Sequence, residues 1–387
     1  MTKHRTLAYP QTTDLDTSPR RAATELQTAL IRQRKDEHLD IVLSRDVDCG
    51  PTTTGFEAVR FVHQALPELA LSDIDLSTAF LGRKVRAPVL ISSMTGGPSR
   101  AAAINENIAT VAQSLGLAFG VGSQRIALET GQSHGIDRNL RRKAPDVPIL
   151  ANLGAAQLSL SKGAEMARRA VDMIEADGLI IHLNPLQEAV QERGDRDWRE
   201  ILSRIGAVCR KLNVPVIVKE VGCGISGSLA RRLLEAGVAV IDIAGAGGTS
   251  WAAVEAERAK TARARAVALA FRGWGLPTAF ALRDVRAACP GAVLIASGGL
   301  RDGVDSAKAI RLGADMTAFA AAILPEAIKS TEALRTRLEI IIEQLRIACF
   351  CTGSRDLAAL RAARLIGQPA ATVTFPSTRK PPMRSAT

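Results

Sequence analysis

The sequence predicts an α/β protein: a (β/α)₈ TIM barrel with an N-terminal extension and an insertion after strand six. Three observations predict this fold class. Eight short apolar, β-branched runs recur along the chain, helix-like segments separate them, and about 240 residues hold all eight. Buried strands that alternate with amphipathic helices pair in parallel, and eight such units close into a barrel.

The eight predicted strands are evenly spaced except at one step. Most strand starts lie 24–36 residues apart, but 54 residues separate the sixth start from the seventh. This extra length predicts an insertion after strand six, on the side of the barrel where active sites lie. Between the strands, segments such as GAEMARRAVDMIEADG have helical periodicity and end near Gly. The strands open at Ala87, Leu117, Val147, Gly178, Val214, Val238, Ala292 and Met316.

The two ends of the chain lack this rhythm. Residues 1–33 are polar and aperiodic, and residues 367–387 carry four prolines, basic residues and no acids. We predict a flexible N-terminal extension over 1–33, a catalytic barrel domain over 34–366, and a basic, proline-containing tail over 367–387.

The composition excludes several classes of protein. With 387 residues, 47% hydrophobic and 23% charged, the chain predicts a soluble globular protein with an ample core. No apolar run approaches the roughly 20 residues of a membrane-spanning helix. The start lacks a secretory apolar stretch, so we expect a cytoplasmic protein. Six cysteines without a C-x-x-C pair predict reduced thiols, neither disulfides nor a zinc knuckle.

The net charge of +11 could indicate nucleic acid, an anionic surface or phosphorylated small molecules. With 3 Trp, 1 Tyr and 9 Phe, base-stacking side chains are scarce. Most Lys and Arg alternate with acids on helix-like segments, as solvated faces do. We therefore expect no nucleic-acid or membrane partner, and a specific anion site elsewhere.

The loop after predicted strand seven points to that anion site. Residues 297–303 read SGGLRDG and lead straight into the helix-like segment GVDSAKAI. Glycines let a ligand approach the backbone, and N–H groups at a helix start attract anions. We expect a phosphate between strands seven and eight, although a tight turn would use the same glycines.

Lys219 ends the apolar run VPVIV, where an ammonium group needs an anionic or electron-rich partner. Three interpretations remain open. Lys219 could form a Schiff base, pair with Glu220, or support the electron-rich edge of a cofactor ring.

Two further segments carry candidate ligands. The loop HLNPLQE holds His182, Asn184, Gln187 and Glu188; a single carboxylate among amides suits Mg²⁺ rather than zinc, but an ordinary surface loop could hold the same residues. Before the barrel, RQRKDEH (residues 32–38) could clamp a diphosphate or form a solvated helix face.

Together these motifs resemble the type 2 isopentenyl-diphosphate isomerases, the FMN-dependent class. The resemblance covers residues 32–366. It rests on RKDEHLDI, FEAVRFVHQALPE, SSMTGG, GVGSQR, HLNPLQE, VPVIVKEVG, GGTSW, GWGLPT, SGGLRDG and CTGSRDL.

The resemblance implies a site for each ligand. Implied FMN ligands are Ser93, Met94, Thr95, Ser123, Asn152, Lys219 and Thr249, with Gly299, Leu300, Arg301, Ala320 and Ala321 for its phosphate. The implied substrate site comprises Arg34, Lys35, His38, Ser123, Gln124, Arg125, His182 and Gln187. Glu188 would bind Mg²⁺, and the implied catalytic residues are Gln187, His182 and Lys219.

The resemblance also implies the reaction. Such enzymes interconvert isopentenyl and dimethylallyl diphosphate with reduced FMN, which NAD(P)H reduces, and they form tetramers or octamers. A double bond shifts when one carbon gains a proton and another loses one, and a weakly basic alkene needs its proton donor held in a dry pocket. Lys219 would tune the N1–O2 edge of the flavin, and Gln187 would assist the proton relay.

Two rival functions have different weaknesses. An FMN-dependent 2-hydroxy-acid oxidoreductase would share the barrel but would need a histidine near the end of strand six, where residues 245–250 contain none. A basic nucleic-acid-binding protein would need its cations gathered into one stripe, which the sequence does not show.

Overall fold

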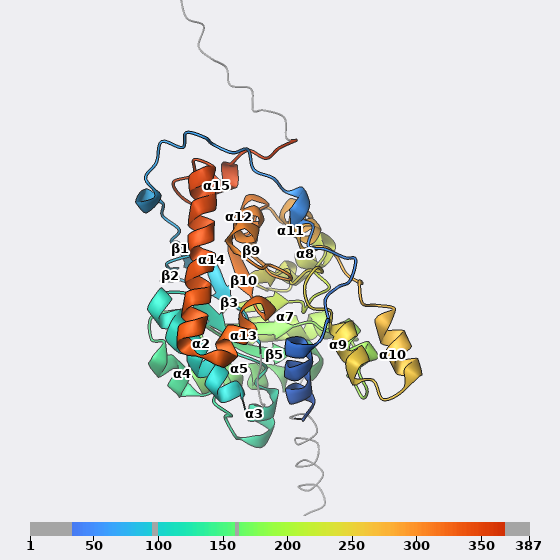
Figure 1. The fold of residues 1–387 in the computed structure, drawn as a ribbon. Coiled ribbons are helices and arrows are strands. Elements are labelled where there is room, and N and C mark those ends of the chain that lie inside the picture. Colours follow the sequence, from blue (N-terminus) through green and yellow to red (C-terminus); the bar gives the residue numbers. More distant parts are fainter. Residues whose placement is uncertain (1–32, 95–99, 159–161, 368–387) are drawn as a thin grey trace, which may run out of the picture.

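A computed structural model describes residues 33–94, 100–158 and 162–367, and it confirms the predicted barrel (Figure 1). The predicted N-terminal extension and basic tail lie outside the described residues, apart from one residue at the inner edge of each. Within the described part of the chain, no helix combines the length and the apolar character needed to span a membrane.

Eight parallel strands form a closed barrel in the order β10-β3-β4-β5-β6-β7-β8-β9. Each predicted apolar run supplies one of them. The strands are β3 (Val89–Ile91), β4 (Ala118–Gly120), β5 (Ile149–Gly154), β6 (Gly178–His182), β7 (Val216–Lys219), β8 (Val240–Asp242), β9 (Val293–Ala296) and β10 (Met316–Phe319).

Helices surround the barrel, and residues 33–44 form a further helix before it. The α-helices are α2 (Ala101–Leu115), α3 (Arg125–Thr130), α4 (Arg138–Lys143), α5 (Gly163–Ile174), α6 (Pro185–Val190), α7 (Ile201–Lys211), α8 (Gly227–Glu235), α9 (Trp251–Arg258), α10 (Ala262–Leu269), α11 (Thr278–Ala288), α12 (Gly303–Arg311), α13 (Leu324–Lys329), α14 (Thr331–Cys351) and α15 (Leu357–Ala362). Short 3₁₀ helices are η1 (Phe56–Ala58), η2 (Leu71–Asp73), η3 (Ala155–Gln157) and η4 (Ala321–Ile323).

The predicted insertion after strand six is present. Helices α9 and α10 come between β8 and α11, and they project at one side of the barrel (Figure 1). A hairpin of β1 (Thr78–Phe80) and β2 (Arg83–Val85) was not predicted. Phe80 and Val85 pack against the apolar interior of the barrel, so the hairpin closes its amino-terminal end.

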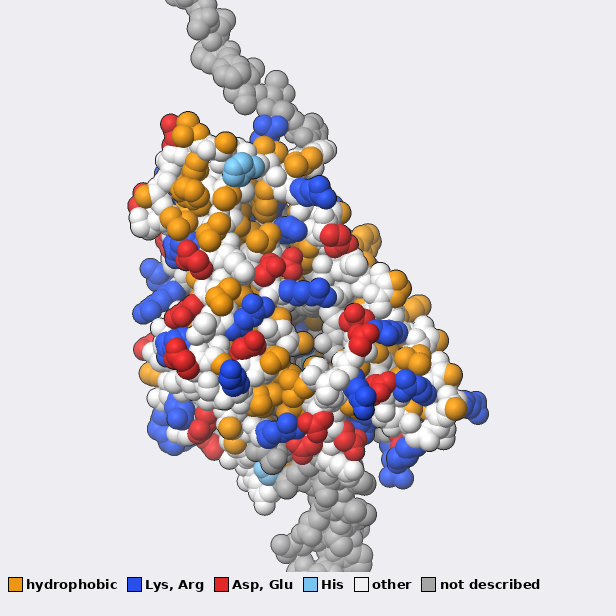
Figure 2. Space-filling model, viewed as in Figure 1, with side chains coloured by type: hydrophobic (Ala, Val, Ile, Leu, Met, Phe, Trp, Pro, Cys, Tyr) orange, Lys and Arg blue, Asp and Glu red, His pale blue; other side chains and the backbone are white. Residues whose placement is uncertain are grey.

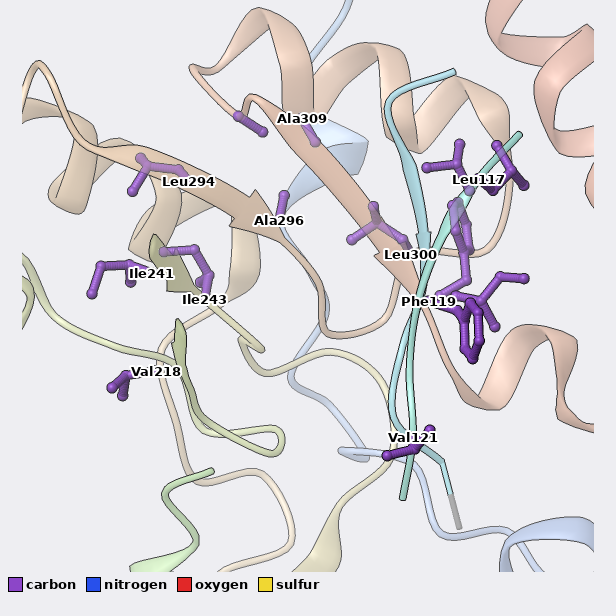
Figure 3. Close-up of a cluster of buried hydrophobic side chains, with 14 of the residues drawn as sticks. Leu117, Phe119, Val121, Val218, Ile241, Ile243, Leu294, Ala296, Leu300 and Ala309 are labelled. Carbon is purple, nitrogen blue, oxygen red and sulfur yellow. The ribbon is translucent and has the colours of Figure 1, made fainter. Parts of the chain in front are cut away.

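Two apolar layers hold the barrel together, because successive side chains of a strand point to opposite faces. One set packs between strands and helices, and Figure 3 shows part of it, including Phe119, Ile241 and Leu294. The other set fills the interior with one or two side chains from each strand. Its barrel members are Leu90, Ala118, Leu150, Ile180, Ile217, Val240, Ile295, Met316 and Ala318.

The interior changes character toward the carboxyl ends of the strands. Side chains two residues apart on a strand point to the same face, so the residue two positions after an interior apolar side chain also points into the barrel. At seven of the eight strands this next position is polar or glycine. These residues are Ser92, Gly120, Asn152, His182, Lys219, Asp242 and Ser297. The apolar interior therefore carries a polar layer on top, which forms the floor of the candidate site.

Candidate active site

A cavity of about 720 Å³ opens over this polar layer. The loops after the barrel strands, the helix at residues 33–44 and the start of α9 line it. Figure 2 shows a hollow near the centre of one face, with acidic and basic side chains around it. The volume lies within the range of roughly 300–1,000 Å³ that small-molecule sites occupy.

The helix at residues 33–44 is pinned across the mouth of the barrel by contacts to α9. His38 Nε2 lies 2.7 Å from Glu255 Oε1, and Arg258 Nη2 lies 2.9 Å from Glu37 Oε2. Arg258 Nη1 also donates to Glu255 Oε2 at 2.7 Å. Burial would raise the pKa of Glu255, but the bonds from His38 and Arg258 prevail and hold that pKa below its usual value. Glu255 therefore stays ionised and fixes His38.

This anchoring brings three basic side chains to one end of the cavity. Arg34 and Lys35 come from the helix at residues 33–44, and Arg125 comes from the start of α3. Burial, followed by the nearby charges of Arg34 and Arg125, lowers the pKa of Lys35 to about 7. Arg34 Nε is buried without a hydrogen-bond partner among the described residues. Arg125 is paired with Glu129 at 2.9 Å, and the three cations together make this end of the cavity basic.

Glu188 lies beside this basic end, on α6. Its carboxylate accepts hydrogen bonds from Asn184 Nδ2 at 3.0 Å, from Gln191 Nε2 at 3.2 Å and from the Asp195 N–H at 2.7 Å. Asn184 Nδ2 also lies 3.2 Å from Gln187 Oε1. The loop after β6 therefore holds one oriented, largely buried carboxylate among amide groups.

Lys219 occupies the floor of the cavity and is buried. Its Nζ donates to the Glu220 carbonyl at 2.6 Å and makes no ion pair within the described residues. Asp242 is its partner in the β7–β8 register, and Asp242 Oδ1 accepts from Ser297 Oγ at 2.5 Å. Asp242 Oδ2 is buried without a partner in the described chain. Burial lowers the pKa of Lys219 and raises that of Asp242, while each charge opposes the shift of the other.

His182 is neutral at physiological pH. Burial, followed by the charges of Lys219 and Lys35, lowers its pKa to about 3. His182 Nδ1 lies 2.9 Å from Asn152 Oδ1, and Asn152 Nδ2 donates to the Val121 carbonyl at 3.1 Å. Because the amide oxygen of Asn152 faces the ring, Nδ1 carries the proton and Nε2 is a hydrogen-bond acceptor.

The opposite end of the cavity lies between the loops after β9 and β10. Gly298 and Gly299 have φ of 93° and 79°, and a Cβ on either would collide with the loop after β8. These glycines are thus required by the packing of loops as well as by any ligand. The N–H groups of Gly299 and Leu300 donate to nothing in the described residues. They remain available to an anion.

The start of α12 is less open to that anion than the sequence suggested. Two of its N-terminal N–H groups are satisfied by side chains: Asp302 Oδ1 accepts from Asp305 N at 2.8 Å, and Gln344 Oε1 accepts from Gly303 N at 3.0 Å. Asp305 Oδ2 accepts from the Arg301 N–H at 3.2 Å. A phosphate here would rely on loop N–H groups and on basic side chains.

Most predicted site residues meet in this one cavity. Thr95 lies outside the described residues. Asn152 does not line the cavity but holds His182, and Gln124 is fully buried, where it bonds the Ala170 carbonyl and the Asn152 N–H. The predicted residues that line it are Arg34, Lys35, His38, Ser93, Met94, Ser123, Arg125, His182, Gln187, Glu188, Lys219, Thr249, Gly299, Leu300, Arg301, Ala320 and Ala321.

Three residues at or beside the cavity were not predicted. Glu255 anchors His38, Asp242 faces Lys219, and Arg337 of α14 reaches the cavity from outside the barrel loops. Asp242 had a visible signal, since an acid interrupts the apolar run VAVIDIAG. Glu255 and Arg337 lie on helices whose sequence shows ordinary alternation of charge.

The described residues fit a bound FMN. The cavity has a buried cation on its floor, and Ser93 Oγ is buried there without a partner in the described chain. Basic side chains and free N–H groups lie at its β9–β10 end. Mg²⁺ has a weaker case, because no group of three or more His, Cys, Asp or Glu side chains gathers anywhere in the described ranges. Glu188 could hold Mg²⁺ only together with ligands from a bound substrate.

Comparison with solved structures supports the fold. A lactate oxidase of Pediococcus acidilactici matches with a TM-score of 0.61 and 15% identity, over 89% of this chain and 94% of that one. A mandelate oxidase matches with a TM-score of 0.57 and 18% identity, over 88% and 97%. At these identities the likeness shows the barrel alone.

Sequence relatives are more specific. The model of the FMN-dependent dehydrogenase family matches residues 151–366. The isopentenyl-diphosphate delta-isomerase of Stutzerimonas stutzeri is 62% identical over 333 residues, 86% of this chain and 96% of that protein. That of Nostoc sp. is 50% identical over 338 residues, 87% and 96%. The chain therefore belongs to the FMN-dependent, type 2 isopentenyl-diphosphate delta-isomerases.

Proposed function

We propose that this protein interconverts isopentenyl diphosphate and dimethylallyl diphosphate, using reduced FMN and Mg²⁺. The observation that carries the proposal is a single cavity with two basic ends and a buried lysine on the floor between the strand ends. One end suits the phosphate of FMN, and the other suits the diphosphate of the substrate. The family to which the chain belongs supplies the reaction.

The basic end formed by Arg34, Lys35 and Arg125 would bind the substrate diphosphate. Charge-assisted hydrogen bonds from arginine to phosphate are among the strongest in proteins. His38, fixed by Glu255, would complete this end of the site. Binding energy from the diphosphate would hold the small isoprenoid tail over the floor of the cavity, away from water.

The side chains around the tail would have distinct tasks. When bound, reduced FMN supplies an electron-rich ring with a nitrogen that can exchange a proton. Lys219 would place positive charge beside that ring. His182 would be an acceptor that orients a neighbouring group, because its pKa of about 3 makes it a poor proton donor or base. Gln187, held by Asn184 and lying 3.4 Å from Glu255 Oε1, would assist the proton relay.

Glu188 would hold Mg²⁺ together with oxygens of the substrate diphosphate. Its orientation by Asn184, Gln191 and the Asp195 N–H is what a single protein ligand of a hydrated Mg²⁺ needs. Reduction of the flavin by NAD(P)H, assembly into tetramers or octamers, a cytoplasmic location and the absence of a nucleic-acid partner remain predictions.

An anaerobic reaction in D₂O tests the function. Isopentenyl diphosphate, reduced FMN and Mg²⁺ with the protein should give dimethylallyl diphosphate that carries deuterium, read by mass spectrometry. The same mixture with oxidised FMN is the control and should give no product. Absence of dimethylallyl product under reducing conditions, or product without deuterium, would refute the proposal.

A further inference from the structure

The phosphate end of the cavity combines a predicted cation, Arg301, with two carboxylates at the start of α12. At the start of α12, Asp302 and Gln344 accept from two of the helix N–H groups and Asp305 accepts from the Arg301 N–H, and the two carboxylates there would repel a phosphate. Burial, followed by the charge of Asp302, raises the pKa of Asp305. With Arg301 as the one predicted cation here, a bound dianion would gain from a second cation.

Arg337 supplies a cation at this place. It lies on the second turn of α14 and lines the cavity with Gly299, Arg301 and Ala321. Its Nη2 donates to the Arg301 carbonyl at 2.8 Å, and its Nε donates to the Ala322 carbonyl at 3.4 Å. The guanidinium therefore ties the loop after β9 to the loop after β10, the two loops between which the phosphate is expected.

The guanidinium has donors left after these two bonds. A guanidinium carries five N–H groups in a planar fork. Nη1 of Arg337 has no partner among the described residues, and Arg337 makes no ion pair there. Its neighbour Arg301 is exposed and its side chain is equally without a carboxylate partner in that part of the chain. A half-buried arginine already fixed by two carbonyls loses little conformational entropy when it binds an anion.

We propose that Arg337 is a phosphate-binding residue of the FMN site and that it holds the two phosphate loops together. The inference rests on the proposed use of FMN, and it assigns a role to a helix outside the barrel loops. Gln344, two turns further along α14, accepts from the Gly303 N–H and so also joins α14 to the segment after β9.

The test compares FMN with riboflavin, which lacks the phosphate. Apoprotein is titrated with each flavin, and quenching of flavin fluorescence gives two dissociation constants. The readout is their ratio, riboflavin over FMN. In Arg337→Gln this ratio should fall about 10- to 100-fold, as expected for loss of hydrogen bonds to a charged group, with riboflavin affinity nearly unchanged. The control is Arg335→Gln, two residues away from Arg337 on α14. The Arg335 guanidinium donates to Ser114 Oγ, so this variant should keep the wild-type ratio.

The outcomes separate binding from folding. Equal weakening of FMN and riboflavin in Arg337→Gln would show a purely structural role and overturn the proposal, as would an unchanged ratio. If Arg337→Gln is unfolded, Arg337→Lys decides instead, because lysine keeps the charge and loses the planar fork of N–H groups. A riboflavin-to-FMN ratio below the wild-type value but above 1 supports the proposal. An unchanged ratio refutes it. Because no isoprenoid is present, failure of the isomerisation assay leaves this ratio unaffected.

Discussion

At the amino-terminal end of the barrel, Asp177 and Asp315 are each paired with arginines, whereas on the cavity floor at the carboxyl-terminal end Lys219 and Asp242 are buried without an ion pair in the described chain. Asp177 accepts from Arg141 Nη2 at 2.6 Å and from Arg83 Nε at 2.7 Å. It also accepts from the Ile149 N–H at 2.9 Å, which ties β5 to the start of β6. Every oxygen of this carboxylate is used.

The same arrangement recurs between β9 and β10. Asp315 accepts from Arg286 Nη2 at 3.0 Å, from Arg361 Nη2 at 3.1 Å and from the Leu294 N–H at 2.9 Å. Like Arg141, Arg286 also donates to several backbone carbonyls beside the strands. Two separate parts of the barrel thus use the same pairing at its amino-terminal end. An arginine from the preceding helix binds an aspartate that stands just before the following strand.

The floor of the cavity, at the carboxyl-terminal end, has no such pairing within the described chain. Lys219 bonds a carbonyl, and Asp242 has a carboxylate oxygen without a partner there. Charges buried in this way reduce the stability of the unliganded protein. Natural proteins depart from full pairing at functional sites, and the difference between the two ends therefore separates the part that stabilises the fold from the part that binds ligands.

Replacement of Lys219 tests the carboxyl-terminal end of the barrel and should have the largest effect on activity. Lys219→Met should lower kcat for isomerisation by about 100- to 1,000-fold, the usual loss for one preorganised electrostatic group. The free energy of unfolding should stay within about 1 kcal/mol of the wild-type value or rise, since the buried ammonium has no ion pair in the described chain and its burial costs stability. Steady-state kinetics and urea titration check both values, with Lys211→Met, at an exposed position that ends α7, as the control. Turnover equal to that of the wild type would remove Lys219 from the mechanism.

Replacement of an arginine at the amino-terminal end of the barrel should have the opposite result, a loss of stability without a loss of kcat. Arg141→Met leaves Asp177 with one arginine fewer and frees the carbonyls of Val147 and Glu175, so the free energy of unfolding should fall by about 2–3 kcal/mol. The protein that remains folded should keep its kcat. Arg142→Met changes the next, exposed residue and should alter neither the free energy of unfolding nor kcat. A large loss of kcat in folded Arg141→Met would break the distinction between the two ends.

The strands and the floor of the site could be predicted because both follow local rules. Parallel barrel strands are continuous apolar runs, and their ends are marked by polar residues such as Lys219 and His182 in the sequence itself. The insertion after strand six was visible as extra length. Most ligand-facing residues were then assigned through resemblance, and the cavity gathers nearly all of those that are described.

The contacts between distant segments could not be predicted. His38 and Glu255 are 217 residues apart, and nothing in either segment specifies the other. Arg337 reaches the site because α14 packs beside α12, which is a property of the assembled barrel. In the sequence motif SQR (residues 123–125), Ser123 and Arg125 line the cavity, but the turn into α3 directs Gln124 into the core. Adjacent residues of one motif can thus have different roles.

A smaller effect is expected at Glu188, which would bind Mg²⁺ together with ligands from the substrate. Glu188→Gln removes the carboxylate charge but keeps its shape, so the Mg²⁺ concentration for half-maximal activity should rise about 10- to 100-fold, the scale seen when a metal site is weakened. Titration of activity with Mg²⁺ measures it. Glu192→Gln, in an exposed pair with Lys260, is the matched control. Unchanged Mg²⁺ dependence in Glu188→Gln would place the ion elsewhere.

The smallest effect concerns pH. Lys35 has a pKa of about 7 because of burial and the cations Arg34 and Arg125, with Glu129 opposing them; nearby His182 is neutral throughout this range. Since a lowered pKa means that the charge is lost as pH rises through about 7, kcat/KM for the diphosphate substrate should decline by about 3- to 10-fold on the alkaline side. Arg at position 35 stays charged, so Lys35→Arg should flatten this decline, while titration of the substrate affects both proteins alike. The same alkaline decline in Lys35→Arg would mean that another group titrates, and the basic end would then be fully charged before substrate binds.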